Sequence, residues 1–512
     1  MNDDGAANAS LWVATTPDTD YPRLEENVIV DVAVLGGGIT GLTAAYLLKN
    51  EGKTVALVEA KRIVCGVTGY TTAKLTVGHS LIYRGVVSTF GEKGARTYAA
   101  SNQAAIERVA QLVEELHIDC DFERASNFVY TESADQVDAI REEVVAAGRA
   151  GVDAHFTTET DLPFAIVGAA RVDGQAQFHP RKYLLPLAAT LPGDGSYVFE
   201  RTRARDVEET DARCVVVTDS GRISAEHVVV ATHLPFLDRG FFFAKAHPAM
   251  SYAVAAEVSE AAAPRGMYIS IDQPTRSIRS TPSPSQAAGR RILIVGGEGH
   301  KPGLEEDTRR RYKALERFLS ERFDAGPIEH RWSAHDYAPL DGVPYVGRLR
   351  RGTRRVYVAT GFAKWGLTKG TLAAMLLTEV IVGRANPWAE LYDAKRLKPR
   401  VSAKTFAKEN GQVALHFVGA RLERREAPDQ VDLGPKEGRV VRLGRRHVAM
   451  YRDEDGAVHM LSARCTHLGC LVEWNAAERT WDCPCHGSRF STTGAVIEGP
   501  AVSPLRAVHP SA

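Results

Sequence analysis

The apolar pattern of the first sixty residues changes period twice. Apolar, mostly β-branched residues fill 29–35, apolar residues at helical spacing occupy 42–48, and a second β-branched run covers 54–58. A glycine-rich segment, 36–41, separates the first run from the second. This order predicts a strand, a tight turn, a helix and a second strand.

The middle of the chain contains further segments with strand-like and helix-like apolar patterns. The runs at 228–232 and 356–362 have the composition of buried strands, and a helix is predicted after the second of them, over 371–381. Between 92 and 150 apolar residues recur at helical spacing, at Ile106, Val109, Val113 and Leu116. We expect that segment to be mostly helical scaffold.

The last eighty residues have a different pattern. Short apolar runs at 439–443, 447–451 and 458–461 are separated by glycine turns, which is typical of a small antiparallel β domain. The polar and charged stretch at 396–430 predicts a linker. We expect four parts, an extension over 1–27, an α/β (α+β) unit over 28–395, the linker over 396–430 and an all-β domain over 431–512.

Composition and charge exclude several kinds of partner. Lys plus Arg and Asp plus Glu both number 63 in a chain of 512 residues, so no global field attracts nucleic acid or an anionic membrane. The longest apolar stretch, 372–382, is far shorter than the ~20 residues of a membrane-spanning helix. The N-terminus has no basic and apolar secretion signal. We therefore expect a cytoplasmic protein with no integral membrane segment.

The glycine-rich segment has the spacing of a dinucleotide-binding turn. Gly36 permits the tight turn, Gly38 allows the backbone to approach a pyrophosphate, and Gly41 lets the helix pack closely on the strand. Glu59 ends the second strand, where a carboxylate can accept hydrogen bonds from an unphosphorylated ribose. The alternative is a glycine turn that serves packing alone.

A second candidate dinucleotide turn lies at 292–300. Gly297 and Gly299 would be its first two glycines, but Pro302 stands where the third is needed, and proline spoils close packing of strand and helix. We expect a substrate-domain strand and turn here, which argues against a second site for NAD(P)H.

Two Cys/His boxes hold four of the seven cysteines: Cys465-Thr466-His467-Leu468-Gly469-Cys470 and Cys483-Pro484-Cys485-His486-Gly487-Ser488. A Rieske-type [2Fe-2S] cluster needs two thiolates on one iron and two imidazoles on the other. Cys465 with His467, and Cys483 with His486, supply one of each per box. A structural zinc site is the alternative, because Cys and His pairs of similar spacing also bind zinc.

The boxes closely resemble those of the Rieske proteins of cytochrome bc complexes. The resemblance implies a disulfide between Cys470 and Cys485, and a hydrogen bond from Ser488 to a bridging sulfide. High-potential members of that family have Tyr two residues after this Ser, donating to a ligand thiolate. Phe490 stands there in this chain, so a lower potential is expected.

The N-terminal unit, with the strands at 228–233 and 356–362 and the segment 341–347, resembles the D-amino-acid oxidase and glycine (sarcosine) oxidase family over about 28–395. The resemblance implies FAD in a Rossmann-like domain built from about 28–90, 195–240 and 340–385, interleaved with an antiparallel-sheet substrate domain. It places the following residues near the cofactor: Thr72, Gly361, Gly366 and Gly370.

Candidate catalytic residues are cations that could hold a substrate carboxylate or lie near the flavin, namely Lys74, Arg279 and Lys364. Sarcosine-type oxidases hold the carboxylate with a lysine on the glycine loop, but the matching position is Thr368, with Lys369 one later. That difference argues against an amino-acid substrate. We expect three histidines to be structural: His179, His233 and His335.

These features together predict an FAD-dependent oxidoreductase that oxidises a small substrate, an amine, amino acid or related compound. Its Rieske cluster would pass electrons one at a time to an external acceptor, a protein or a quinone. The alternatives are an NAD(P)H-dependent electron-transfer reductase and a non-catalytic redox sensor.

Overall fold

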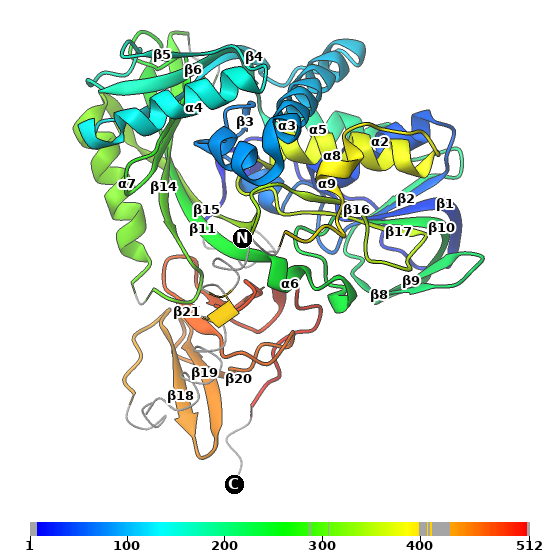
Figure 1. The fold of residues 1–512 in the computed structure, drawn as a ribbon. Coiled ribbons are helices and arrows are strands. Elements are labelled where there is room, and N and C mark those ends of the chain that lie inside the picture. The colour runs from blue at the N-terminus through cyan, green and yellow to red at the C-terminus, as the bar shows by residue number, and fades with distance from the viewer. Residues whose placement is uncertain are drawn as a thin grey trace.

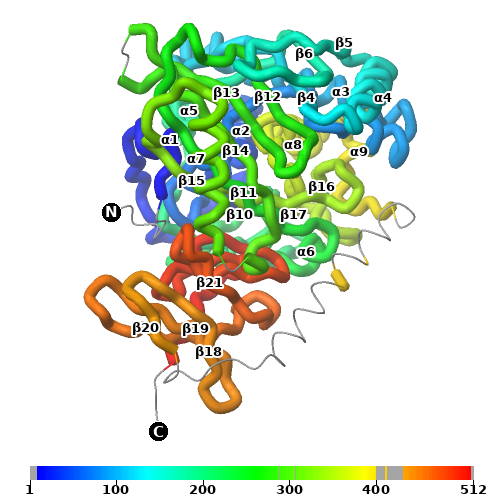
Figure 2. Tube along the Cα trace, turned by 90° about the vertical axis from the view of Figure 1, so that its left-hand side faces the viewer, coloured from blue at the N-terminus to red at the C-terminus, as the bar shows by residue number. Residues whose placement is uncertain are grey.

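The computed structural model describes residues 8–285, 288–305, 307–398, 407, 410–411 and 431–508. We call residues 8–398 the N-terminal unit and residues 431–508 the C-terminal domain. Most of the predicted linker, 396–430, lies outside the described residues. Figures 1 and 2 show the C-terminal domain against one end of the N-terminal unit, below strands β11 and β15.

The first sheet of the N-terminal unit has the order β16-β17-β10-β1-β2-β7, with β8 and β9 continuing from β10. Five neighbouring strands run parallel, because the β-branched runs around the glycine turn are each buried on both faces. All its strands come from the segments 28–90, 195–240 and 340–385. Their bounds are β1 Val28–Leu35, β2 Val55–Val58, β7 Tyr197–Phe199, β8 Ala204–Glu209, β9 Cys214–Thr218, β10 Arg222–Val230, β16 Tyr345–Arg348 and β17 Val356–Thr360.

Helices α2 (Ile39–Asn50) and α8 (Gly366–Ile381) pack side by side on one face of this sheet (Figure 1). Gly370 makes the contact close, because a Cβ there would lie 2.7 Å from the Thr40 hydroxyl oxygen. The other helices of the N-terminal unit are α1 Leu11–Ala14, α3 Ile82–Glu115, α4 Val137–Arg149, α5 Pro180–Ala189, α6 Phe242–Lys245, α7 Arg309–Arg322 and α9 Ala389–Tyr392, with 3-10 turns η1 Val67–Tyr70, η2 Ala134–Gln136 and η3 Asp238–Gly240.

The second sheet is mostly antiparallel, with the order β15-β11-β14-β13-β12-β4-β6-β3 and β5 beside β6. The expectation that 92–150 is mostly helical is confirmed by α3 and α4, but buried Phe128, Val129 and Tyr130 form a strand between them. The bounds are β3 Lys74–Leu75, β4 Glu123–Thr131, β5 Ala154–Thr157, β6 Gly168–Gln177, β11 Ala246–Ser259, β12 Met267–Ser270, β13 Arg276–Pro282, β14 Arg290–His300 and β15 Ala325–Pro339.

The candidate second dinucleotide turn is part of strand β14, whose pairing with β11 shifts register between Gly297 and His300. Residues Gly296 and Gly297 lie within β14, paired with β11 on one side and β13 on the other. The helix that follows begins only at Arg309. The segment is thus a strand of the second sheet, as its Pro302 predicts.

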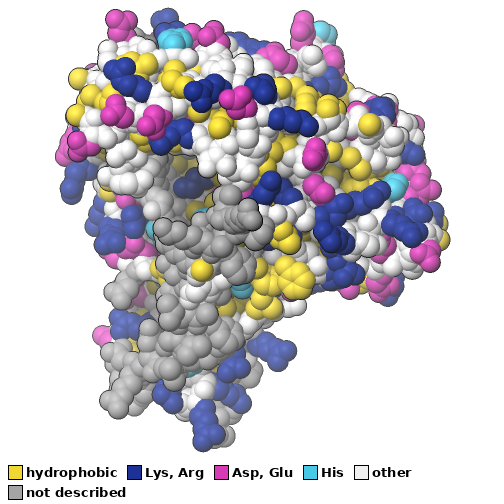
Figure 3. All heavy atoms as spheres, viewed as in Figure 1, with side chains coloured by type: hydrophobic (Ala, Val, Ile, Leu, Met, Phe, Trp, Pro, Cys, Tyr) yellow, Lys and Arg dark blue, Asp and Glu magenta, His cyan; other side chains and the backbone are white. Residues whose placement is uncertain are grey.

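The C-terminal domain consists of two small antiparallel sheets. One contains β18 Gly438–Leu443, β19 Arg446–Arg452 and β20 Val458–Ser462, and the other contains β21 Glu473–Asn475, β22 Thr480–Asp482, β23 Arg489–Phe490 and β24 Val496–Glu498. No helix in the described ranges is long and apolar enough to cross a membrane. On the face seen in Figure 3, charged side chains of both signs are interspersed.

Candidate active site

A cavity of about 1020 Å³ lies where the carboxyl ends of β1, β10 and β17 meet the second sheet. Residues of the glycine turn form one end of it, and residues of the C-terminal domain contribute to its wall. Crevices at the carboxyl ends of parallel strands are the usual ligand sites of such sheets. Its wall includes Gly36, Gly38, Glu59, Thr72, Lys74, His233, Trp332, His335, Asp336, Lys364, Gly366, Arg489 and Glu498.

The glycine turn has no room for larger residues. Gly36 has a φ of +112°, and a Cβ there would lie 2.4 Å from the Ala231 carbonyl oxygen. A Cβ on Gly41 would lie 1.8 Å from the Gly36 carbonyl oxygen, so glycine sets the contact between α2 and the turn. Glu59 holds the turn by accepting hydrogen bonds from the Gly37 and Lys61 amides at 2.8 and 2.9 Å. The residues present therefore fit a dinucleotide cofactor.

Of the three later glycines that the family resemblance places near the cofactor, only Gly366 lines the cavity. Gly361 has a φ of +80° and turns the chain beside Pro339, while Gly370 packs α8 on α2. Thr368 and Lys369 are buried in α8 away from the cavity, and Thr368 donates to the Thr76 carbonyl at 3.1 Å. Which of these residues reach the cavity therefore depends on how α8 is oriented, and not on their being part of the glycine-rich loop.

Lys74 is predicted to lie near the flavin and Arg279 to hold a substrate carboxylate, and of these two only Lys74 lines the cavity. Its amine donates to the Tyr268 carbonyl and to Ser277 Oγ at 2.7 Å. Burial, with a contribution from Arg279, holds the pKa of Lys74 well below its usual value. A lysine in this state can act as a neutral amine.

Arg279 lies behind the cavity wall, so its proposed contact with substrate is corrected. Its guanidinium donates to the backbone carbonyls of Ala73 at 2.5 Å and Phe178 at 3.5 Å, and to that of Thr72 at 3.4 Å. Burial lowers the pKa of Arg279 to about 9. Its position indicates that it holds the backbone of 72–73 in place.

Three residues with left-handed backbone meet at the ends of β10 and β17. His233, Ala363 and Lys364 have φ values of 66°, 52° and 70°. Asp336 holds this corner, since its carboxylate lies 3.2 Å from His233 Nε2 and accepts from the Lys364 amide. Backbone strain of this kind persists only where the surroundings fix it. Sequence reasoning missed Asp336, because these partners are 103 and 28 residues away.

Lys364 extends its side chain into the cavity from this corner. Its Nζ lies 3.2 Å from the point that a Cβ on Gly299 would occupy, so a larger residue there would crowd the ammonium group. Burial lowers the pKa of Lys364, and the Asp336 charge opposes that shift. Lys364 is therefore placed to meet an anionic group of a ligand.

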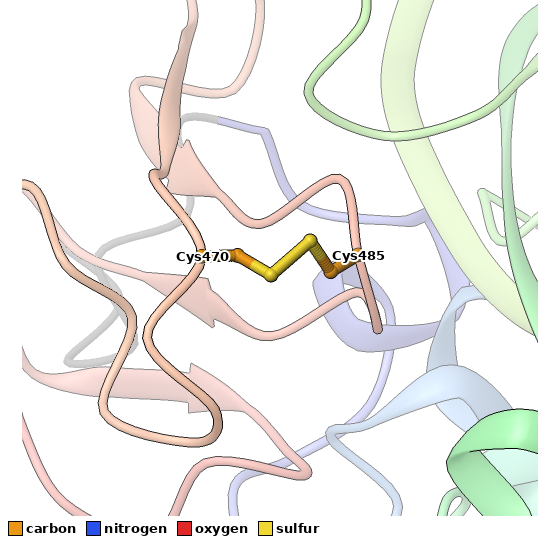
Figure 4. The surroundings of a disulfide bond; sticks show 2 residues. All are labelled: Cys470 and Cys485. Carbon is orange, nitrogen blue, oxygen red and sulfur yellow. A yellow bond between two sulfur atoms is a disulfide. The ribbon is translucent and has the colours of Figure 1, made fainter. Parts of the chain in front are cut away.

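The two Cys/His boxes form adjacent loops of the C-terminal domain. Cys470 and Cys485 form a disulfide between them, with an S–S distance of 2.11 Å (Figure 4). Cys465 and Cys483 are buried, and a hydrogen bond from the Cys483 thiol lowers the pKa of Cys465. Ser488 also donates toward Cys465 and accepts from the Ala501 amide at 3.1 Å.

The four predicted ligands are arranged as two pairs. The two thiols touch, and the His467 and His486 rings lie 5.0 Å apart. In the part of the chain that the structure describes, these four side chains do not come close enough together to bind one shared ion. Two thiolates on one side and two imidazoles on the other fit a two-iron cluster better than one zinc ion.

The boxes are held against the N-terminal unit by buried side chains. The Tyr337 hydroxyl donates to the His486 carbonyl at 2.8 Å and to the Gly499 carbonyl at 3.3 Å. Glu498 lies 3.2 Å from Nδ1 of both His233 and His335. His233 and His335, expected to be structural, thus line the cavity and link it to the C-terminal domain, whereas His179 does cap α5.

Comparisons with known proteins cover both parts of the chain. A family model described as FAD dependent oxidoreductase matches residues 31–380, and one described as Rieske [2Fe-2S] domain matches residues 426–509. The chain belongs to the FAD-dependent oxidoreductase family. It carries a Rieske domain in the same chain, so the oxidoreductase binds FAD and a [2Fe-2S] cluster, and the predicted family, fold class and cofactors are confirmed.

Similar proteins include the Bacillus subtilis protein YhfW, which is named as a Rieske 2Fe-2S iron-sulfur protein. It is 34% identical over 503 residues, 98% of each chain. The gamma-glutamylputrescine oxidoreductase of Escherichia coli is 24% identical over 73% of this chain and 88% of its own. Among solved structures, glycine oxidase from Geobacillus kaustophilus has a TM-score of 0.60 at 18% identity, over 72% of this chain and 99% of that one.

The buried histidine at the domain junction predicts a pH dependence for the oxidoreductase. Burial alone would lower the pKa of His233, but Asp336 and Glu498 outweigh it and raise the pKa to about 9. Protonated His233 therefore stabilises the folded state. This stabilisation is complete below about pH 6.5, the pKa of a histidine in the unfolded chain, and is lost as pH rises through about 9. We expect the free energy of unfolding, measured with urea, to decrease by up to about 3 kcal/mol over this range, because one pKa unit corresponds to about 1.36 kcal/mol.

A His233→Asn variant is the control for this dependence. It should be less stable than the natural protein at pH near 6 and should lack the decrease at alkaline pH. An equal alkaline decrease in both proteins would assign it to another group.

Phe490 offers a test of how the C-terminal domain sets the cluster's potential. It is fully buried in one core with Cys465 and Cys483. Phe490→Tyr adds a hydroxyl that can donate to a ligand thiolate, and such a bond stabilises the reduced cluster. We expect a higher midpoint potential in protein-film voltammetry. An unchanged midpoint would contradict the predicted effect.

Proposed function

We propose that the oxidoreductase oxidises a small amine or amino acid and passes the electrons singly through its cluster to an external acceptor, a protein or a quinone. The shared cavity carries this proposal, because the glycine turn and Glu498 of the C-terminal domain line the same space. Two similar proteins, gamma-glutamylputrescine oxidoreductase and glycine oxidase, act on substrates of this class according to their names, which supports the proposal.

FAD, when bound, takes an electron pair from the substrate, whereas a [2Fe-2S] cluster takes one electron at a time. Oxidation of an amine C–N bond to C=N releases a hydride from carbon and a proton from nitrogen. FAD would supply the acceptor for that hydride. Lys74 would take up the proton, because its amine lines the cavity and burial, which lowers its pKa, favours the neutral amine.

Lys364 would orient the substrate by pairing with an acidic group. Its ammonium extends into the cavity across from Gly299. Lys74 already donates to Tyr268 and Ser277, so its amine is held in place for proton transfer rather than for binding. Lys364 would thus take the part of the lysine that is missing at position 368, so this division of roles favours an amine that also carries a carboxylate.

Replacing Lys364 with methionine tests this role. A hydrogen bond to a charged group contributes about 1.5–3 kcal/mol, and each 1.4 kcal/mol is about tenfold in binding. We expect KM for a carboxylate-bearing substrate to rise about ten- to hundredfold, with a smaller change in kcat. Lys313→Met, on the exposed face of α7, is the matched control. An equal effect in both variants would refute the assignment.

An anaerobic stopped-flow screen tests the function as a whole. Flavin absorbance should bleach rapidly with at least one amine or amino acid and then the cluster should become reduced. Rapid bleaching by NADH or NADPH, with none by amines, would instead identify an NAD(P)H-dependent reductase.

A further inference from the structure

One short segment of the N-terminal unit covers the outer nitrogen of a cluster ligand. Asp238, in η3, has its Oδ1 2.8 Å from Nε2 of His467. The His467 side chain is only 4% exposed. The ring nitrogen that is free to face outward when the other binds iron is therefore hydrogen-bonded to a carboxylate from the other half of the chain.

The same segment covers the second imidazole. The Phe243 ring, in α6, lies edge-on 5.2 Å from the ring of His486 and 5.8 Å from that of His467. His486 is 6% exposed. We call residues 238–243 the cap. The last two residues of the cap belong to α6. Figures 1 and 2 both show α6 directly above the C-terminal domain.

The cap is fixed to the first sheet. Phe242 and Leu237 are buried in one cluster with Tyr345 and Leu349, and a Cβ on Gly240 would lie 2.3 Å from the Phe242 ring. The packing holds the backbone on both sides of Asp238. The hydrogen bond to His467 is therefore made by a preorganised group.

The charge of Asp238 is not cancelled by its basic neighbour. Arg239 is directed toward Asp206, at 2.8 Å, and the Val207 carbonyl, at 2.7 Å. A carboxylate that accepts from the outer nitrogen makes an imidazole a more basic ligand and favours the oxidised metal.

We propose that the cap makes the imidazole edge of the cluster the electron-entry side, facing the N-terminal unit, and that Asp238 is a positioning residue that lowers the cluster's midpoint potential. The direction of flow rests on the proposed function, whereas the effect on potential does not. With the cap in place, an external acceptor must approach the cluster from another side.

Protein-film voltammetry of the full-length holoprotein tests the effect on potential without any substrate. We expect Asp238→Asn to raise the midpoint and Asp238→Lys to raise it further, with the cluster absorbance retained. Asp206→Asn removes a nearby carboxylate that pairs with Arg239, and should leave the midpoint unchanged. An unchanged midpoint in Asp238→Asn would overturn the proposal, and so would loss of the cluster, which would make Asp238 merely structural.

Chemical labelling tests the covering itself. Diethyl pyrocarbonate modifies accessible imidazoles, and peptide mass spectrometry locates the label. We expect His467 and His486 to be protected in the natural protein and labelled faster in Phe243→Ala. Equal labelling rates in the two proteins would overturn the covering by Phe243. Failure of the amine screen alone would leave both results standing.

Discussion

Replacing Gly41 with alanine is expected to leave the oxidoreductase largely without flavin. The new Cβ would lie 1.8 Å from the Gly36 carbonyl oxygen, so α2 must move away from the turn that would hold the cofactor's pyrophosphate. Overpacking against backbone costs about 1–3 kcal/mol, and each 1.4 kcal/mol weakens binding about tenfold. We expect flavin affinity to fall about 5- to 150-fold.

Flavin content after gel filtration, read from the ratio of flavin to protein absorbance, measures this loss. Gly148→Ala is the control, since Gly148 is also helical and a Cβ there would meet nothing within 4 Å. Alanine should stabilise that helix by up to about 1 kcal/mol and leave the flavin bound. Full flavin content in Gly41→Ala would show that the turn adapts and that the motif tolerates a side chain.

The second large effect is expected from Gly487→Ala, at the contact between the cluster loop and the N-terminal unit. Gly487 has a φ of +74°, and a Cβ there would lie 2.4 Å from His335 Nε2 and 2.9 Å from Pro248. A cost of about 1–3 kcal/mol shifts a docking equilibrium by about 5- to 150-fold. We expect transfer of electrons from flavin to cluster to slow by a comparable factor.

Flash photoreduction of the bound flavin, followed by the rate of cluster reduction, measures this coupling without a substrate. Gly456→Ala is the matched control, because Gly456 has a φ of +85° and open space around it. Both substitutions place alanine in a left-handed backbone conformation, which costs about 1–2 kcal/mol. The two variants therefore differ only in the clash. His335→Ala in the Gly487→Ala background removes the clashing ring and should restore part of the rate. No recovery in the double variant would place the damage within the cluster loop itself.

The two lysines and the arginine proposed for catalysis differ in position in a way that the sequence does not reveal. All three are basic residues near expected cofactor segments, and nothing in their local sequence separates them. Lys74 and Lys364 line the cavity, while Arg279 is enclosed by the carbonyls of Ala73 and Phe178. The side of β13 on which Arg279 lies depends on strand register within the second sheet, which local sequence does not specify.

Sequence alone determined the features whose chemistry is local. The glycine turn at 36–41, Glu59 and the two Cys/His boxes are short segments in which spacing itself places the functional groups, so FAD and the [2Fe-2S] cluster could be predicted. Only the tertiary structure decided how these sites meet. Asp336, Glu498 and Asp238 act on partners up to 265 residues away, the distance in sequence between Glu498 and His233. Such contacts arise from the packing of the C-terminal domain on the cavity, which no local pattern records.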